Sequence, residues 1–107
     1  MACSLDILGD KWTLLVLRDL LDGKTRFSEF ERSPEGIPTN ILTDRLRRLE
    51  ATGLADRVRS ETSTRSTYVP TDQGRALRPV LLALAAWGNA YLAETWTPPA
   101  EWLAPPS

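Results

Sequence analysis

The chain has 107 residues, of which 42% are hydrophobic and 25% are charged, and its formal net charge is −1. This length predicts one domain with a modest core, and no apolar run is long enough to cross a bilayer, so we expect a cytoplasmic protein with no membrane partner. One cysteine and no histidine exclude an internal disulfide, a zinc site of the usual Cys/His type and a catalytic pair that needs histidine. We therefore expect no cofactor, no metal and no enzyme activity.

The first expected elements are a short apolar turn at residues 5–8 and a longer helix at Lys11–Leu21. Asp10 is a good cap for the longer helix, and Gly23 follows its last turn, as helix-ending glycines do. Apolar residues recur around most of this helix, which predicts that it is buried on several sides and forms the core of the domain. Trp12 is interpreted as part of that core, with a place in a ligand pocket as the alternative.

A short helix, a proline-glycine break and a longer amphipathic helix follow one another between residues 28 and 53. We expect Ser28 to cap the short helix, with Glu31 as its partner three residues later, and Pro38 to begin the long one. The leucines that share one side of the long helix are Leu42, Leu46 and Leu49. The residues that point outward are Thr39, Asn40, Thr43, Asp44 and Arg47. This arrangement is typical of a helix-turn-helix whose second helix fits the DNA major groove.

The sequence predicts two strands, at residues 54–59 and 66–70, joined by a polar loop at residues 60–65. A hairpin directly after such a helix is typical of the wing that reaches the DNA backbone or minor groove, although an ordinary surface hairpin has the same pattern. Positive charge gathers in this part of the chain, at Arg45, Arg47, Arg48, Arg57, Arg59 and Arg65. DNA binding needs such local charge, although the low net charge of the whole chain argues against it. The alternative is an ordinary solvated face, which charge-rich segments usually form.

Thr71 is expected to cap a last helix that Pro79 kinks or splits. The apolar stripe of this helix is too long for the small core alone, which predicts pairing with a second subunit, with packing against the first long helix as the alternative. The stripe consists of Ala76, Leu77, Val80, Leu81, Leu84, Trp87 and Tyr91. Residues 94–107 form a proline-rich tail, in which Trp96 and Trp102 are expected to dock on the domain or on its partner.

Four motifs are specific in their combination: Leu-Gly-Asp-Lys-Trp at residues 8–12, Arg-Phe-Ser-Glu-Phe at 26–30, Gly-Ile-Pro-Thr-Asn at 36–40 and Ala-Trp-Gly at 86–88. Together the chain resembles the HxlR-type (DUF24) winged helix-turn-helix regulators of bacteria. The resemblance implies an α+β fold, a winged helix-turn-helix with a C-terminal dimerisation helix, in residues 1–93. It also implies a recognition helix at 39–52, a wing between residues 57 and 68, and a homodimer formed by the terminal helices. The residues expected in the dimer interface are Leu5, Leu8, Leu77, Leu81, Leu84, Trp87 and Tyr91.

A regulator of this kind binds double-stranded operator DNA with dyad symmetry, and the chain is interpreted as a sequence-specific transcriptional regulator. Asn40, Thr43 and Asp44 are the candidates for contacts with base edges, because asparagine can pair with adenine and a carboxylate can accept from cytosine. The candidates for phosphate contacts are Ser28, Thr39, Arg47, Arg48, Arg59 and Arg65. The alternative is a winged-helix protein-interaction module without an operator of its own, which the near-neutral charge favours.

The resemblance also bears on the signal, since several members of the family sense oxidants or electrophiles through an N-terminal cysteine. Cys3 stands three residues before Asp6, whereas the family's cysteine usually stands about seven before the matching aspartate, a shift of about one helical turn. Redox sensing by Cys3 and an incidental residue near the terminus both stay open. A small-molecule effector is the other candidate signal, and we expect its site in the dimer groove near Trp12, Trp87 and Tyr91.

Overall fold

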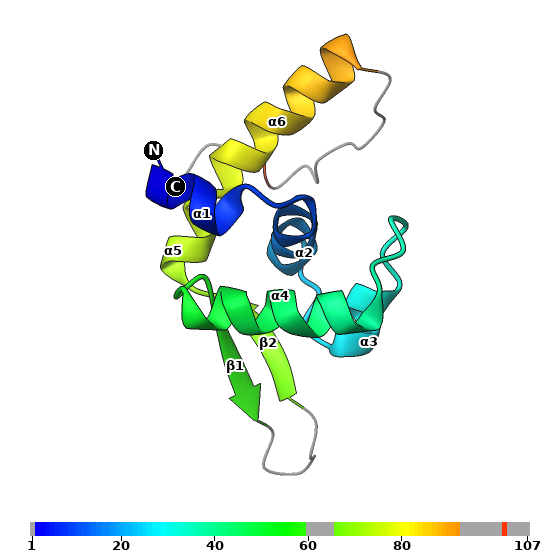
Figure 1. Cartoon of the computed structure of the whole chain (residues 1–107), viewed down its shortest axis with the longest axis vertical. Coiled ribbons are helices and arrows are strands. Elements are labelled where there is room, and N and C mark those ends of the chain that lie inside the picture. Colours follow the sequence, from blue (N-terminus) through cyan, green and yellow to red (C-terminus); the bar gives the residue numbers. More distant parts are fainter. Residues whose placement is uncertain (1, 60–65, 93–101, 103–107) are drawn as a thin grey trace.

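A computed structural model describes residues 2–59, 66–92 and 102 of the chain, apart from the side chains of Ala2, Ser4 and Leu5. The elements in chain order are α1 (Ala2–Leu8), α2 (Lys11–Leu21), α3 (Phe27–Glu31), α4 (Thr39–Ala51), β1 (Ala55–Arg59), β2 (Ser66–Pro70), α5 (Asp72–Arg75) and α6 (Arg78–Tyr91) (Figure 1). β1 and β2 pair antiparallel, with Ala55 opposite Pro70 and Arg59 opposite Ser66. The fold is a winged helix-turn-helix of the α+β class with a C-terminal helix, as the sequence predicts.

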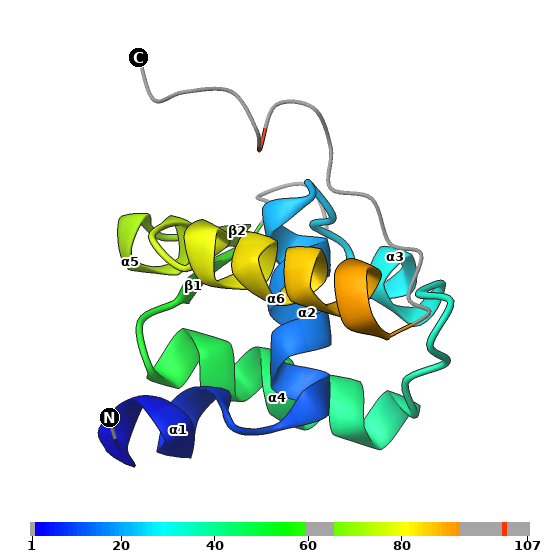
Figure 2. The same cartoon turned by 90° about the horizontal axis from the view of Figure 1, so that it is seen from above.

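The core forms around α2, which passes between α4 and α6 (Figures 1 and 2). Asp10 caps this helix as predicted, because its carboxylate accepts hydrogen bonds from the backbone N–H groups of Trp12 and Thr13 at 2.8 and 3.1 Å. Trp12 is half-buried and packs against the core. The buried side chains at the centre are Val16, Leu17, Leu20, Leu21, Phe30, Leu42, Leu46 and Leu49. Each contributes roughly 1.5–3 kcal/mol through burial, so this cluster is the main source of stability.

The end of α4, the start of β1 and the start of α5 meet at a tight junction. Gly53 ends α4 with a φ of +81°, a left-handed conformation that favours glycine. The Thr71 hydroxyl donates to the Gly53 carbonyl at 2.6 Å and accepts from the Gly74 N–H at 3.1 Å, which caps α5. A Cβ atom at Gly74 would lie 2.2 Å from the Leu54 carbonyl oxygen, so a larger residue requires the backbone to move.

The start of α3 differs from the sequence prediction. Ser28 was expected to cap this helix with Glu31, but the cap is Arg26, two residues earlier, so α3 begins at Phe27 and Ser28 lies within it. The Glu29 carboxylate accepts from the backbone N–H groups of Thr25 and Arg26 at 3.1 and 2.9 Å and so satisfies the helix start. The reason is tertiary, since Arg26 is held in an extended conformation by a β-bridge to Thr67.

Pro79 divides the last helical segment, as predicted, and lies in the first turn of α6. α6 has apolar residues on two neighbouring sides. The side that faces the rest of the chain buries Leu81, Ala85 and Gly88. A neighbouring side, about a quarter of a turn around the helix, exposes Leu84, Trp87 and Tyr91, with exposed fractions of 49%, 55% and 75%. The apolar stripe therefore serves the core of this chain and also leaves a row of large apolar side chains uncovered.

Trp102 packs in the core with 5% of its surface exposed, and the Arg78 guanidinium lies 5.3 Å from the centre of its ring. This tryptophan therefore docks on the domain itself. Trp96 and the other residues of the 94–107 tail lie outside the described residues. Among the residues that are described, no helix is both long and apolar enough to cross a bilayer, and no cluster of His, Cys, Asp or Glu is arranged to hold a metal ion.

Candidate nucleic-acid interface

α4 has one buried and one exposed face, as the spacing of its leucines predicts. Leu42, Leu46 and Leu49 are at most 1% exposed and hold the helix against α2. On the other face Thr43 is half-buried, and the exposed side chains are Thr39, Asn40, Asp44, Arg47 and Arg48. Because the core fixes the first face, the second is presented to solvent in one orientation, as a recognition helix must be.

The first turn of α4 contains Asn40, whose amide side chain is free to bind another molecule. Pro38 precedes the helix and provides no side-chain cap. Asn40 is exposed and has no hydrogen-bond partner in the described part of the chain, so both ends of its amide can bind another molecule. The hydroxyls of its neighbours are in use, since Thr39 donates to the Glu31 carboxylate at 3.2 Å and Thr43 donates to the Thr39 carbonyl at 3.0 Å. Among the predicted base-contacting residues, Asn40 is thus the one with unused donors.

Asp44 lies on the exposed face but its carboxylate is already paired. It accepts a hydrogen bond from Arg45 and lies 3.5 Å from Nε of Arg48, one helical turn further on. To accept from a cytosine, this carboxylate has to exchange at least one of these partners. Arg47 differs from its neighbours, because it is exposed and no ion pair or hydrogen bond engages it among the described residues.

Arg45 joins the recognition helix to the start of α2. Its Nε and one terminal nitrogen contact the two carboxylate oxygens of Asp10 at 3.2 and 2.7 Å, and only 16% of its side chain is exposed. The hydrogen bond from Arg45 lowers the pKa of Asp10 below its ordinary value. Asp10 therefore caps α2 and also anchors α4. From the sequence, Arg45 is grouped with the surface arginines, because its partner Asp10 is 35 positions away and no local pattern links the two.

A second ion-pair network fixes the loop before α4. Glu35 accepts from the Arg18 guanidinium at 2.7 and 3.0 Å and from the Ser33 hydroxyl at 2.7 Å. The hydrogen bonds from Arg18 lower the pKa of Glu35 to about 2. Arg18 also contacts Asp19, which is 5% exposed and lies 3.3 Å from Lys24. This network ties the loop to the end of α2, so α4 is positioned both before its first turn and along its length.

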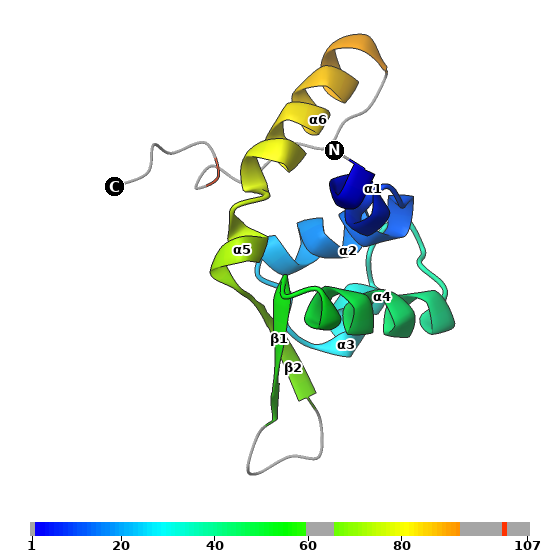
Figure 3. The same ribbon diagram turned by 60° about the vertical axis from the view of Figure 1, so that its left-hand side comes forward.

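The β1–β2 hairpin extends beside α4 at the end of the molecule opposite α6 (Figures 1 and 3). Arg57 lies 3.8 Å from Glu50 of α4. Arg59 is exposed at the end of β1 and makes no ion pair with any described residue. Arg65 and the loop at residues 60–65 lie outside the described residues. Of the predicted phosphate contacts, Arg47 and Arg59 are thus available without breaking an internal pair, and Ser28 is exposed on α3.

The residues predicted for the dimer interface do not all share one surface. Leu8 and Leu77 pack partly against the core of their own chain, and Leu81 is 6% exposed within it. The exposed members are Leu84, Trp87 and Tyr91 of α6. The Leu5 side chain lies outside the described residues, and Cys3 is exposed on α1.

The three residues expected to line the effector groove differ in exposure. Trp87 and Tyr91 lie against each other, with ring centres 5.9 Å apart, on the exposed side of α6. Trp12 is half-buried against the core, and its ring lies 4.6 Å from Nζ of Lys11.

A family model described as HxlR-like helix-turn-helix matches residues 7–96 of the chain. An HTH-type transcriptional regulator of Methanothermobacter thermautotrophicus is 43% identical over 94 residues, which cover 83% of this chain and 72% of that protein. The regulator Mb3122 of Mycobacterium bovis is 40% identical over 97 residues, and here the match covers 90% of this chain but only 61% of the relative. The solved structure of the redox regulator HypR in its reduced form superposes with a TM-score of 0.74 at 36% identity, covering 83% of this chain and 89% of HypR.

Proposed function

Since the chain belongs to the HxlR-like helix-turn-helix family of transcriptional regulators, we propose that it binds operator DNA as a homodimer. Residues 1–93 form the DNA-binding and dimerisation domain in this proposal. α4 of each subunit enters the major groove, and the β1–β2 wing contacts the neighbouring backbone. Two such helices, about one DNA turn apart, read an operator with dyad symmetry. No enzymatic role is involved, because the family consists of regulators.

The observation that carries the proposal is the divided surface of α4. The three leucines of one face are at most 1% exposed, while the other face presents the unpaired side chains of Asn40 and Arg47. Asn40, which we expect to read adenine, thus lies about two helical turns from Arg47, which we expect to bind phosphate. The orientation of the helix that holds both is fixed. The ion pair between Asp10 and Arg45 supports the same arrangement, since it places a charged anchor on the inner side of the helix.

Dimerisation is proposed through the terminal helices, with the main surface on α6 and a contribution from α1. Leu84, Trp87 and Tyr91 form an exposed apolar row on the side of α6 that the domain does not cover. Large exposed apolar side chains in a row are unusual on a monomer and typical of an association surface. The position of α6 at the end opposite the wing leaves α4 and the hairpin of each subunit open to DNA (Figure 3).

The salt dependence of DNA binding tests the proposal against the alternative of a protein-interaction module, which the net charge of −1 favours. Fluorescence anisotropy with duplex DNA is expected to show affinity that falls steeply between about 50 mM and 200 mM salt, because phosphate contacts release counterions. Arg47→Ala should reduce the slope by about one unit, whereas Arg75→Ala on α5 serves as the control and should not. Absence of saturable duplex binding at low salt would favour the interaction module.

A redox response through Cys3 is a separate part of the proposal. It is supported by the similarity to HypR and by the exposure of Cys3 on α1. Because the chain has one cysteine, any disulfide must join Cys3 to another molecule. Diamide treatment should therefore produce a reducible covalent dimer and change operator affinity, and Cys3→Ser should abolish both effects. Unchanged affinity of the oxidised protein would assign the signal to a small molecule instead.

A further inference from the structure

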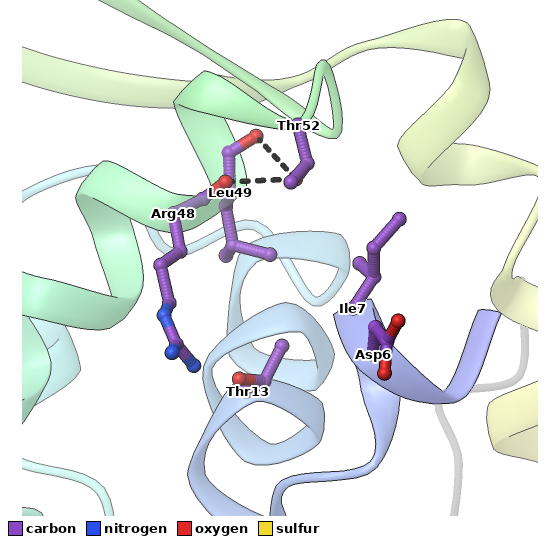
Figure 4. Close-up of a pocket in the computed structure, with 6 residues that line it drawn as sticks. All are labelled: Asp6, Ile7, Thr13, Arg48, Leu49 and Thr52. Atoms are coloured by element: carbon purple, nitrogen blue, oxygen red, sulfur yellow. Dashed lines mark hydrogen bonds between the residues drawn. The ribbon is translucent and has the colours of Figure 1, made fainter. Parts of the chain in front are cut away.

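A pocket of about 130 Å³ lies where α1, α2 and α4 meet (Figure 4). It is distinct from the groove near Trp12, Trp87 and Tyr91 that the sequence analysis favoured. Two of its lining residues, Leu49 and Thr13, are at most 1% exposed, while Asp6 of α1, Arg48 of α4 and Thr52, which follows α4, are exposed. The six lining residues are Asp6, Ile7, Thr13, Arg48, Leu49 and Thr52.

The hydroxyl of Thr13 is the unusual group in this pocket. Thr13 is 1% exposed, and its Oγ1 atom has no hydrogen-bond partner in the described part of the chain. Its side chain is drawn at the pocket in Figure 4, on the first turns of α2. Buried polar atoms in folded proteins are nearly always hydrogen-bonded, so an unpaired buried hydroxyl marks the position of a missing partner.

The other polar groups of the pocket define the chemistry of that partner. Arg48 can only donate hydrogen bonds, and Nε of its guanidinium is the part that lies near Asp44. Asp6 can only accept and is exposed, without an ion pair to any described residue. Figure 4 shows Arg48 and Asp6 on opposite sides of Thr13. The Thr52 hydroxyl donates to the Arg48 carbonyl at 2.7 Å, so it is left as an acceptor.

We propose that this pocket binds a small zwitterion, a free amino acid with a short side chain. The carboxylate contacts Arg48, the ammonium group contacts Asp6 and Thr52, and the side chain lies between Ile7 and Leu49 with its end at Thr13. The size agrees, because a pocket of about 130 Å³ is close to the roughly 150 Å³ cavity that holds benzene. Alanine and serine, with six and seven non-hydrogen atoms, are therefore of suitable volume.

The site has a consequence that rests on the proposed function. Arg48 belongs to the recognition helix and is one of the predicted phosphate contacts, so a carboxylate bound to it competes with the DNA backbone. The zwitterion should weaken operator binding, and the operator should weaken zwitterion binding by the same factor, since coupling between two ligands is reciprocal.

Titration of the DNA-free protein followed by backbone amide NMR tests the site itself. L-serine and L-alanine are the probes, and propionate and ethylamine, which each lack one of the two charges, are their controls. We expect saturable shifts at Ile7, Thr13 and Leu49 in the millimolar range for L-serine, weaker binding of L-alanine, and no saturation with the controls. Absence of saturation with both amino acids, or equal binding of the controls, would overturn the proposal.

Two variants connect the binding to named atoms. Thr13→Val keeps the shape of the side chain and removes only an unpaired hydroxyl, so the variant should fold at least as stably as the parent and bind L-serine about tenfold more weakly. Arg48→Gln should lose binding of both amino acids, whereas Arg47→Gln, the neighbouring exposed arginine outside the pocket, should not. Unchanged binding in Thr13→Val and Arg48→Gln would refute the assignment. The coupling is tested separately by fluorescence anisotropy with duplex DNA, in which L-serine should weaken binding. If L-serine binds the protein but leaves DNA affinity unchanged, the coupling is refuted and the site remains.

Discussion

The pair formed by Asp10 and Arg45 should contribute measurably to stability. Asp10→Asn is the informative change, because asparagine caps a helix as well as aspartate does but cannot offer two carboxylate oxygens to a guanidinium. The variant therefore separates the anchoring of α4 from the capping of α2. Asp10→Ala removes both and should be the less stable of the two variants.

The magnitude follows from the burial of the pair. The Arg45 and Asp10 side chains are 16% and 31% exposed, so the pair lies between a surface ion pair, worth about 0–1 kcal/mol, and a buried hydrogen bond to a charged group, worth about 1.5–3 kcal/mol. We expect Asp10→Asn to lower the free energy of unfolding by about 1–2 kcal/mol. In a domain of this size each kcal/mol shifts the melting temperature by roughly 4–8 °C.

A double-mutant cycle followed by urea unfolding measures the interaction free energy between Asp10 and Arg45. Asp10→Asn, Arg45→Gln and the double variant should give a coupling free energy of about 1 kcal/mol or more. The matched control is Asp72→Asn with Arg75→Gln, a solvent-exposed pair at 3.1 Å on α5, which should show no measurable coupling. A coupling for Asp10 and Arg45 no larger than that of the control would refute the reasoning.

The pH dependence of the same pair has a definite sign. The pKa of Asp10 is lowered in the folded protein from an ordinary value of 3.8. The stabilisation is therefore fully present above pH 3.8 and is lost as the pH falls below it, through the folded-state pKa. Parent and Asp10→Asn should converge in stability under acid conditions, and parallel curves would count against the ion pair.

The remaining predictions concern other parts of the fold and the interface. Glu35→Gln should remove an acid-dependent contribution: the pKa of Glu35 is lowered from 4.5 to about 2, so the parent should lose more stability than the variant as the pH falls from 4.5 towards 2, as acid unfolding followed by circular dichroism will show. Gly74→Ala should destabilise the protein by about 1–3 kcal/mol in urea unfolding, because its Cβ would lie 2.2 Å from a carbonyl oxygen; an unchanged midpoint would mean that the junction is loose. Asn40→Ala should leave the melting temperature unchanged and cost roughly 1–3 kcal/mol of discrimination at one base pair, and identical preferred DNA sequences for parent and variant would move base reading to Thr43 and Asp44. Trp87→Glu should convert the dimer to a species of 11.9 kDa in light scattering, and a parent that already scatters as 11.9 kDa would exclude the α6 dimer.

Local signals account for what the sequence predicted well. The start of α2 depends on the cap at Asp10, and the inward leucines of α4 follow the helical repeat. The break near Pro79 follows from a ring that lacks an N–H. Each of these signals acts within a few residues. Long-range contacts account for the differences. The start of α3 was misplaced because Ser28 with Glu31 and Arg26 with Glu29 are overlapping cap patterns, and the β-bridge from Arg26 to Thr67 decides between them.

In the candidate site, too, the features set by local signals were predicted and those set by long-range contacts were not. The exposed face of α4 was predictable from periodicity, but the pairing of Arg45 with Asp10 depends on how α2 and α4 cross. The sequence predicted that the apolar stripe of α6 exceeds the core but not which of its residues are buried, since Leu81 and Leu84 are equally apolar and only packing shows that the first is 6% and the second 49% exposed.

Selection of randomised duplexes by the purified protein, followed by sequencing of the retained DNA, tests the central claim most directly. If two copies of α4 read two half-sites, the enriched sequences should contain an inverted repeat with half-site centres about 10 base pairs apart, and Arg47→Ala should retain the same sequences more weakly. Retained DNA without a common sequence, or a single unrepeated site bound by one subunit, would contradict the account.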